Sequence, residues 1–193
     1  INKPVVIGHS LGSALSLWFA QDHSDLIRGV FAVDGLPVLP RSENMSPEQR
    51  KATVEGMRGQ MANLTQEVFE QQQISYMKFM GVIDDKVAET IGKRSATSDR
   101  TAYVDYMAEL FGKDMRKDMP KISVPVGMVC PYYAKDMAAM NMSEEQKTAY
   151  YAGLMAGTPK LQMISINEAR HFVMIDQPKI FNEKLASFVK SVE

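Results

Sequence analysis

The sequence lacks the features that mark secreted, membrane-spanning and nucleic-acid-binding proteins. Its single cysteine, Cys130, cannot form a disulfide within the chain, so the composition gives no sign of disulfide stapling. No run approaches the ~20 apolar residues of a membrane span, and no signal peptide is visible. With 22 basic and 23 acidic residues the net charge is −1, and no run of like charges stands out. We therefore expect a soluble protein, cytoplasmic by default, that binds neither nucleic acid nor membranes.

The length and apolar content are sufficient for one globular domain. The chain has 193 residues, of which 45% are hydrophobic, and such a chain can bury an ordinary core. It starts at Ile1 rather than at methionine, only a few residues before an expected core strand. A missing native start, with any signal peptide, therefore stays open.

The stretch that carries most chemical information is Gly8-His9-Ser10-Leu11-Gly12. It lies between a β-branched run and an apolar helical stretch, so the expected order is strand, sharp turn, helix. Such a turn strains the serine backbone and lifts its hydroxyl clear of the sheet, and we expect close contacts to require the flanking glycines. The amide of Leu11 then lies at the positive end of the helix, facing an oxygen bound over Ser10. The pattern predicts Ser10 as a nucleophile and Leu11 as an oxyanion donor.

An alternating pattern of strands and helices surrounds a purely helical stretch. We expect buried parallel strands at 4–7, 29–33, 124–130 and 161–166. Between 41 and 112 no β-rich run occurs, and methionine, glutamine and alanine dominate at helical spacing. We therefore expect three parts: an elbow-bearing α/β core over 1–40, a helical cap over 41–112, and the rest of the α/β core over 113–193.

Two of these stretches together resemble the α/β-hydrolase superfamily. Residues 3–12 are similar to its strand 5 and nucleophile elbow, and 169–178 are similar to the loop that carries its catalytic histidine. The resemblance implies a partial α/β-hydrolase fold: a parallel sheet of about four strands, flanked by helices, with an all-helical cap insertion. It covers the C-terminal half of the family's fold from strand 5 onward. Strands 1 to 4 of the family, and the loop that supplies its second oxyanion donor, have no counterpart in this sequence.

The resemblance implies that His171 is the general base, because the family places its histidine after the acid and near the end of the chain. In that role His171 takes a proton from Ser10 and returns it to the leaving group. We expect His9 to pack beside the turn and His23 to lie on the surface.

The acid that orients this histidine is open between two aspartates. Asp136 comes six residues after the third expected strand, the usual family position, but the intervening Pro131-Tyr132-Tyr133 is unlike the usual glycine-containing turn. Asp34 directly ends the second expected strand, at the sheet edge where the sites of open α/β sheets lie. Haloalkane dehalogenases and pancreatic-type lipases, which resemble this fold, use an acid there. We favour Asp34, keep Asp136 as the alternative, and name Asp176 as a third candidate.

The nucleophile limits the reaction class. A serine at position 10 indicates an acyl-enzyme and hence ester, thioester or amide substrates, whereas dehalogenase and epoxide-hydrolase chemistry needs an aspartate there. The favoured interpretation is a carboxylesterase for a small-molecule ester, with no cofactor and no metal. Peptidases and carbon–carbon bond hydrolases use the same triad and stay open. The alternative of another class is a weakly active or non-catalytic binding module, because the second oxyanion donor is not visible.

The expected topology also makes a prediction about assembly. Strand 4–7 is central in the family but lies at the edge of a four-stranded sheet here, and an apolar edge is a template for another chain. The methionine-rich helices are expected to add an apolar face, which usually marks an interface. We therefore expect a homo-oligomer, unless the sequence is a fragment of a longer polypeptide whose other half covers the same edge.

Overall fold

A computed structural model describes residues 2–193, except for the side chain of Ala62. Its four strands are all parallel and lie side by side in the order of the sequence. They are β1 (Val5–His9), β2 (Gly29–Val33), β3 (Val126–Tyr132) and β4 (Leu161–Asn167). The structure thus confirms the predicted α/β class and the four parallel strands.

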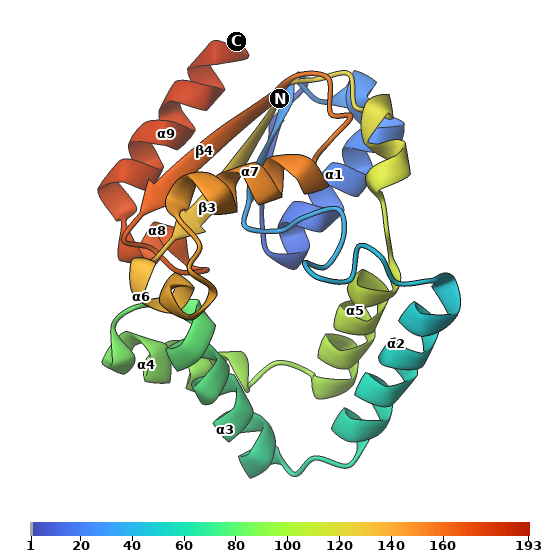
Figure 1. The fold of residues 1–193 in the computed structure, drawn as a ribbon, viewed down its shortest axis with the longest axis vertical. Helices are drawn as coiled ribbons and strands as arrows, with labels where there is room; N and C mark the ends of the chain where they lie inside the picture. The colour runs from blue at the N-terminus through green and yellow to red at the C-terminus, as the bar shows by residue number, and fades with distance from the viewer. Residues whose placement is uncertain (1) are drawn as a thin grey trace.

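Helices cover both faces of this sheet (Figure 1). α1 (Leu11–His23) and α7 (Glu144–Leu154) pack on one face, where they bury alternate strand residues such as Ala32 and Met128. α8 (Val173–Asp176) and α9 (Pro178–Ser191) pack on the other face against Phe31 and its neighbours. β2 is buried along its whole length because helices lie on both of its faces.

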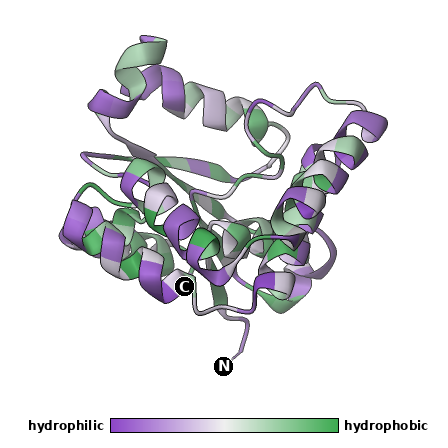
Figure 2. Ribbon diagram, turned by 90° about the horizontal axis from the view of Figure 1, so that it is seen from below, coloured by the Kyte–Doolittle hydropathy of each residue, from purple (hydrophilic) through white to green (hydrophobic). Residues whose placement is uncertain are grey.

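Several of the helices are amphipathic or capped at their starts. Figure 2 shows hydrophilic and hydrophobic segments alternating along the helices around the sheet. Ser143 and Gln146 form a capping box at the start of α7, and Pro178 is the first residue of α9. Four short helical turns lie in the connections: η1 (Ser24–Leu26), η3 (Arg116–Lys121), α6 (Ala134–Met137) and η4 (Ala138–Met140).

A group of helices between β2 and β3 lies apart from the sheet, in the lower half of Figure 1. We call this group the helical segment. No strand occurs in it among the described residues, in agreement with the absence of β-rich sequence. It consists of α2 (Pro47–Ala62), α3 (Gln66–Tyr76), the π-helical turn η2 (Met77–Gly81), α4 (Asp85–Ser95) and α5 (Arg100–Gly112).

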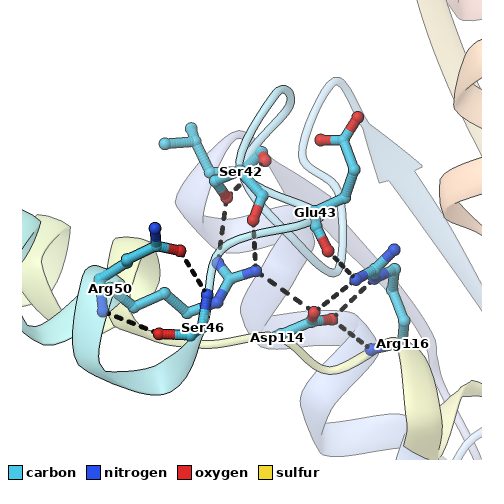
Figure 3. Close-up of polar contacts among 8 residues, drawn as sticks. Ser42, Glu43, Ser46, Arg50, Asp114 and Arg116 are labelled. Carbon is cyan, nitrogen blue, oxygen red and sulfur yellow. Dashed lines mark hydrogen bonds and ion pairs between the residues drawn. The ribbon is translucent and has the colours of Figure 1, made fainter.

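A polar network ties together the two connections that join the helical segment to the sheet (Figure 3). The two connections meet in an isolated antiparallel bridge. Arg50 is buried and donates to Asp114, 3.3 Å away, and to both the hydroxyl and the carbonyl of Ser42. Arg116 makes two bonds to the same carboxylate, at 2.9 and 2.7 Å, and one to the carbonyl of Glu43. Because a buried arginine without its partners costs several kcal/mol, this network fixes where the helical segment leaves the core.

The free edge of β1 is apolar. Within the described part of the chain β1 pairs only with β2, so its other edge carries unpaired backbone groups. Ile7 on β1, and Leu15, Trp18 and Phe19 on α1, are large apolar side chains that remain exposed.

Candidate active site

Ser10 occupies a sharp turn between β1 and α1. Its backbone has φ 56° and ψ −120°, a left-handed conformation that is strained for a residue with a side chain. Its amide donates to the carbonyl of Val33 at the end of β2, with an N–O distance of 2.9 Å. This strand–turn–helix geometry is the context that the Gly-x-Ser-x-Gly motif requires.

Close contacts explain one flanking glycine but not the other. A Cβ added to Gly8 would lie 2.1 Å from the carbonyl oxygen of Gly12 and 2.4 Å from Oγ of Ser16, so no larger residue fits. A Cβ on Gly12 would meet nothing within 4 Å, so the expectation that this glycine is also required sterically is wrong. Close contacts require a glycine at position 35 instead, because a Cβ there would lie 2.0 Å from the carbonyl oxygen of Ser10.

Asp34 and His171 are joined by a short hydrogen bond. The Nδ1–H of His171 donates to Oδ2 of Asp34 at 2.6 Å, and each side chain is only 12% exposed. Asp34 directly follows β2 and His171 lies in the loop after β4, so both come from the carboxyl edge of the sheet. A carboxylate on Nδ1 fixes the imidazole tautomer and leaves Nε2 as the basic nitrogen. Within residues 2–193 the Ser10 hydroxyl has no hydrogen-bond partner.

His9 ties the serine turn to the loop of His171. Its Nε2–H donates to the carbonyl oxygen of His171 at 2.9 Å. Its ring contacts those of His171 and Phe172, at centroid distances of 4.5 and 4.7 Å. Burial, and then repulsion from His171, lower the pKa of His9 to about 4. His9 is therefore neutral at neutral pH and packs beside the turn, as predicted.

Asp34 is ionised, and each of its two carboxylate oxygens accepts a hydrogen bond. Burial raises its pKa, but the hydrogen bond and charge of His171, the charge of Lys147 and the hydroxyl of Tyr151 together lower the pKa of Asp34 below its usual value. Tyr151 donates to Oδ1 at 2.6 Å, opposite the bond from His171. Like Ser10, Asp34 has a positive φ, here 46°, and is therefore a strained backbone position at this edge.

The helical segment reaches the site through its π-helical turn. The amides of His171 and Phe172 donate to the carbonyl oxygens of Met80 and Gly81, at 3.1 and 2.9 Å. The ring of Tyr76 lies 6.3 Å from that of His171 in an edge-on arrangement. Burial, followed by the negative charge of Asp34, raises the pKa of Tyr76 to about 12. π-Helical turns are rare and often occur at functional sites.

The alternative acid, Asp136, does not meet the histidine. Both of its oxygens accept from Arg170, at 2.8 and 2.7 Å. The same guanidinium donates to the carbonyls of Lys78 and Val82, so it joins the loop after β3 to the helical segment. Asp136, in the helical turn α6 after β3, thus pairs with Arg170 rather than with His171.

The remaining candidates also lie elsewhere. Asp176 accepts from the backbone amides of Arg170 and Ile83, at 2.8 and 3.0 Å, and therefore supports the loop. His23 is exposed at the end of α1, as predicted.

Sequence reasoning missed two tyrosines at this edge. Tyr151 occupies an apolar position of α7 and resembles an ordinary core residue in the sequence, so no local signal marks it. Tyr76 is the last residue of α3, and only the backbone pairing of the following turn with the His171 loop brings it to the site. In both cases, contacts between segments that are far apart in the sequence bring the tyrosine to the site.

A cavity of about 510 Å³ begins beside the serine turn, between α1 and α5. The amide of Leu11 starts α1 and has no partner within the helix. Trp18 and Leu15 form one wall and Tyr106 with Leu110 the other. Arg58 and Asp105, which form an ion pair of 3.2 Å, also line the cavity. This size falls in the range of small-molecule sites.

Neither a metal cluster nor a membrane-crossing helix is found in the described part of the chain. No three His, Cys, Asp or Glu side chains gather as metal ligands would. None of the helices of residues 2–193 has the length and apolar character that crossing a bilayer requires.

Comparison with known proteins identifies the fold. A family model described as the alpha/beta hydrolase fold matches residues 1–83. The curated proteins include no match to the chain. Among solved structures, the enol-lactonase from Burkholderia xenovorans LB400 is 17% identical with a TM-score of 0.69, over 98% of this chain and 66% of that one.

Two further structures have similar values. An esterase from Thermogutta terrifontis is 19% identical with a TM-score of 0.70, over 99% of this chain and 66% of that one. MenH from S. aureus is 13% identical with a TM-score of 0.75, over 98% and 68% respectively. The chain therefore has the α/β-hydrolase fold, as its motifs predicted. It spans about two thirds of the length of these relatives.

Proposed function

We propose that the protein is a serine hydrolase that cleaves carboxylic esters through an acyl-enzyme on Ser10. The observation that carries the proposal is the hydrogen bond between Asp34 and His171. A second hydrogen bond, from His9 to the carbonyl of His171, ties the loop of His171 to the serine turn. Nucleophilic acyl transfer needs a nucleophile and a base that a carboxylate orients, and the Asp34–His171 bond together with the strained turn at Ser10 supports this assignment.

Each residue then has a defined step. Nε2 of His171 takes the proton of Ser10 as Oγ attacks the ester carbonyl, and Asp34 stabilises the imidazolium that forms. The amide of Leu11 donates to the oxyanion. His171 then gives the proton to the leaving alcohol, and a water molecule activated by the same histidine hydrolyses the acyl-enzyme. No cofactor takes part in these steps.

The cavity beside Leu11 supports a small ester as substrate. Its walls are largely apolar and include Leu11, the residue after Ser10, and this supports the proposal that it receives one side of the ester. The names of two relatives, an esterase and an enol-lactonase, also denote enzymes that act on ester bonds. Peptide and carbon–carbon bond cleavage use the same residues, and a substrate panel separates them.

The test is hydrolysis of p-nitrophenyl esters of increasing acyl length, with a p-nitroanilide as the amide control. We expect the wild type to hydrolyse the short-chain esters and Ser10→Ala or His171→Ala to lose at least ~10³-fold in kcat. Circular dichroism verifies that both variants are folded. Equal rates for wild type and Ser10→Ala would refute the serine mechanism, and folded wild-type protein with no hydrolysis would favour a non-catalytic binding module.

A further inference from the structure

The carboxylate of Asp34 receives one short hydrogen bond on each oxygen. His171 donates to Oδ2 and Tyr151 donates to Oδ1, both at 2.6 Å. The two donors come from different parts of the fold: His171 from the loop after β4, and Tyr151 from α7. A carboxylate bonded on one oxygen alone is free to rotate about its Cβ–Cγ bond, whereas bonds on both oxygens fix its plane.

The hydroxyl of Tyr151 has a fixed position. Its side chain is only 7% exposed and packs in the core between α1, α7 and the sheet. Burial, and then the charge of Asp34, raise the pKa of Tyr151 well above its ordinary value, so the hydroxyl stays protonated and always donates.

Lys147 supports the same arrangement one helical turn earlier. Its Nζ donates to the carbonyl of Pro131 at 2.5 Å and lies 5.5 Å from the centre of the Tyr151 ring. Its positive charge also helps to lower the pKa of Asp34. α7 thus supplies a hydrogen-bond donor and a positive charge to one carboxylate.

We propose that Tyr151 is a positioning residue, whose hydroxyl holds the Asp34 carboxylate so that it accepts the Nδ1–H of His171 during catalysis. This role rests on the ester hydrolysis proposed above. It adds Tyr151 to Ser10, His171 and Asp34 as a residue that acts through Asp34 without touching the substrate. Tyr151→Phe removes only the hydroxyl and leaves one buried carboxylate oxygen without a donor.

Tyr150 is a matched control because it is adjacent on the same helix. Its hydroxyl accepts from the amide of Arg41 at 2.9 Å and donates to Glu43 at 3.1 Å, away from Asp34. Tyr150→Phe therefore also removes one bonded tyrosine hydroxyl from α7, but it leaves Asp34 untouched.

The first measurement needs no activity: the carboxyl carbon of Asp34 is titrated by NMR in the wild type, Tyr151→Phe and Tyr150→Phe. We expect the pKa of Asp34 to rise by about one pH unit in Tyr151→Phe, because a donor to the charged form is lost. Tyr150→Phe should match the wild type. An unchanged Asp34 titration in Tyr151→Phe overturns the inference even if Ser10 proves to be the nucleophile.

The second measurement is a double-mutant cycle on ester hydrolysis. We expect Tyr151→Phe to lower kcat by about 10- to 100-fold with KM unchanged, and to change kcat less than about twofold when Asp34 is already alanine. An equal loss in both backgrounds would mean that Tyr151 acts on general stability, and the inference would fail. Failure of the proposed function is seen separately, as a Ser10→Ala variant with the wild-type rate, and the carboxyl titration still decides whether Tyr151 holds Asp34.

Discussion

His9 makes the free energy of unfolding depend on pH between about pH 4 and pH 6.5. Its pKa is about 4 in the folded protein, lowered by burial and by the neighbouring His171, against an ordinary value of 6.5 in an unfolded chain. The unfolded chain therefore binds a proton on this residue between pH 6.5 and pH 4 that the folded protein does not. Stability is present in full above pH 6.5 and falls as the pH approaches 4.

The size of this loss follows from the two pKa values. A separation of 2.5 pH units at 1.36 kcal/mol for each unit gives a contribution of about 3 kcal/mol, most of it lost by pH 4. That is a large share of the ~5–15 kcal/mol of a typical domain. Asp34, whose folded pKa is also lowered, loses its contribution only below its ordinary value of 3.8 and does not overlap this window.

Urea unfolding of the wild type and His9→Asn at pH 7 and pH 4 measures the effect. Asparagine does not titrate, but its shorter amide does not reach the position of Nε2, the atom that bonds to the carbonyl of His171, so the two proteins are compared in pH dependence and not in absolute stability. We expect the free energy of unfolding of the wild type to fall by about 3 kcal/mol more than that of His9→Asn between the two pH values. The control His23→Asn changes an exposed histidine and should behave as the wild type. Equal pH dependence in wild type and His9→Asn would show that His9 is not held neutral.

Three further predictions concern the acid, the turn and the free edge. Asp34→Asn should lower kcat by ~10³- to 10⁴-fold because it disturbs the histidine tautomer, and Asp136→Asn by less than about tenfold; the reverse ranking in steady-state kinetics would reassign the acid. In thermal unfolding, Gly8→Ala should destabilise the protein by at least ~2 kcal/mol. Gly12→Ala lies in open space within α1 and should stabilise the protein by about 0.5–1 kcal/mol. Equal effects of the two substitutions would contradict the contacts described for the turn. We propose that the apolar edge formed by β1 and α1 makes the 193-residue chain self-associate, so light scattering should detect oligomers that Trp18→Lys weakens, and a monomer at micromolar concentration would contradict this.

The strands and helices were predictable because local patterns decide them. β-Branched runs predict the four strands. Ser46 and Ser143 are each followed three residues later by glutamine, which is the pattern of a capping box, and the structure has a capping box at each. The strand, turn and helix around Ser10 followed in the same way. These features depend on residues that are close in the sequence, so they can be predicted without knowledge of the tertiary structure.

The choice between two acids was not decidable from local sequence. Asp34 and Asp136 both follow strands at the same sheet edge, and only the pairing of Arg170 with Asp136 turns the latter away from His171. The role of Tyr151 is likewise visible only once α7 is packed against the sheet, where its hydroxyl meets Asp34. Such roles arise from contacts over more than 30 residues of sequence separation, which a periodic pattern does not report.

Covalent labelling measures most directly whether Ser10 is a nucleophile activated by His171. The protein is treated with a fluorophosphonate, which forms a stable adduct with activated serines, and the modified peptide is found by mass spectrometry. We predict one adduct, on Ser10, that is absent from Ser10→Ala and forms at least ~10²-fold more slowly in His171→Ala. An adduct on another residue, or equal labelling rates in the wild type and folded His171→Ala, would contradict the mechanism.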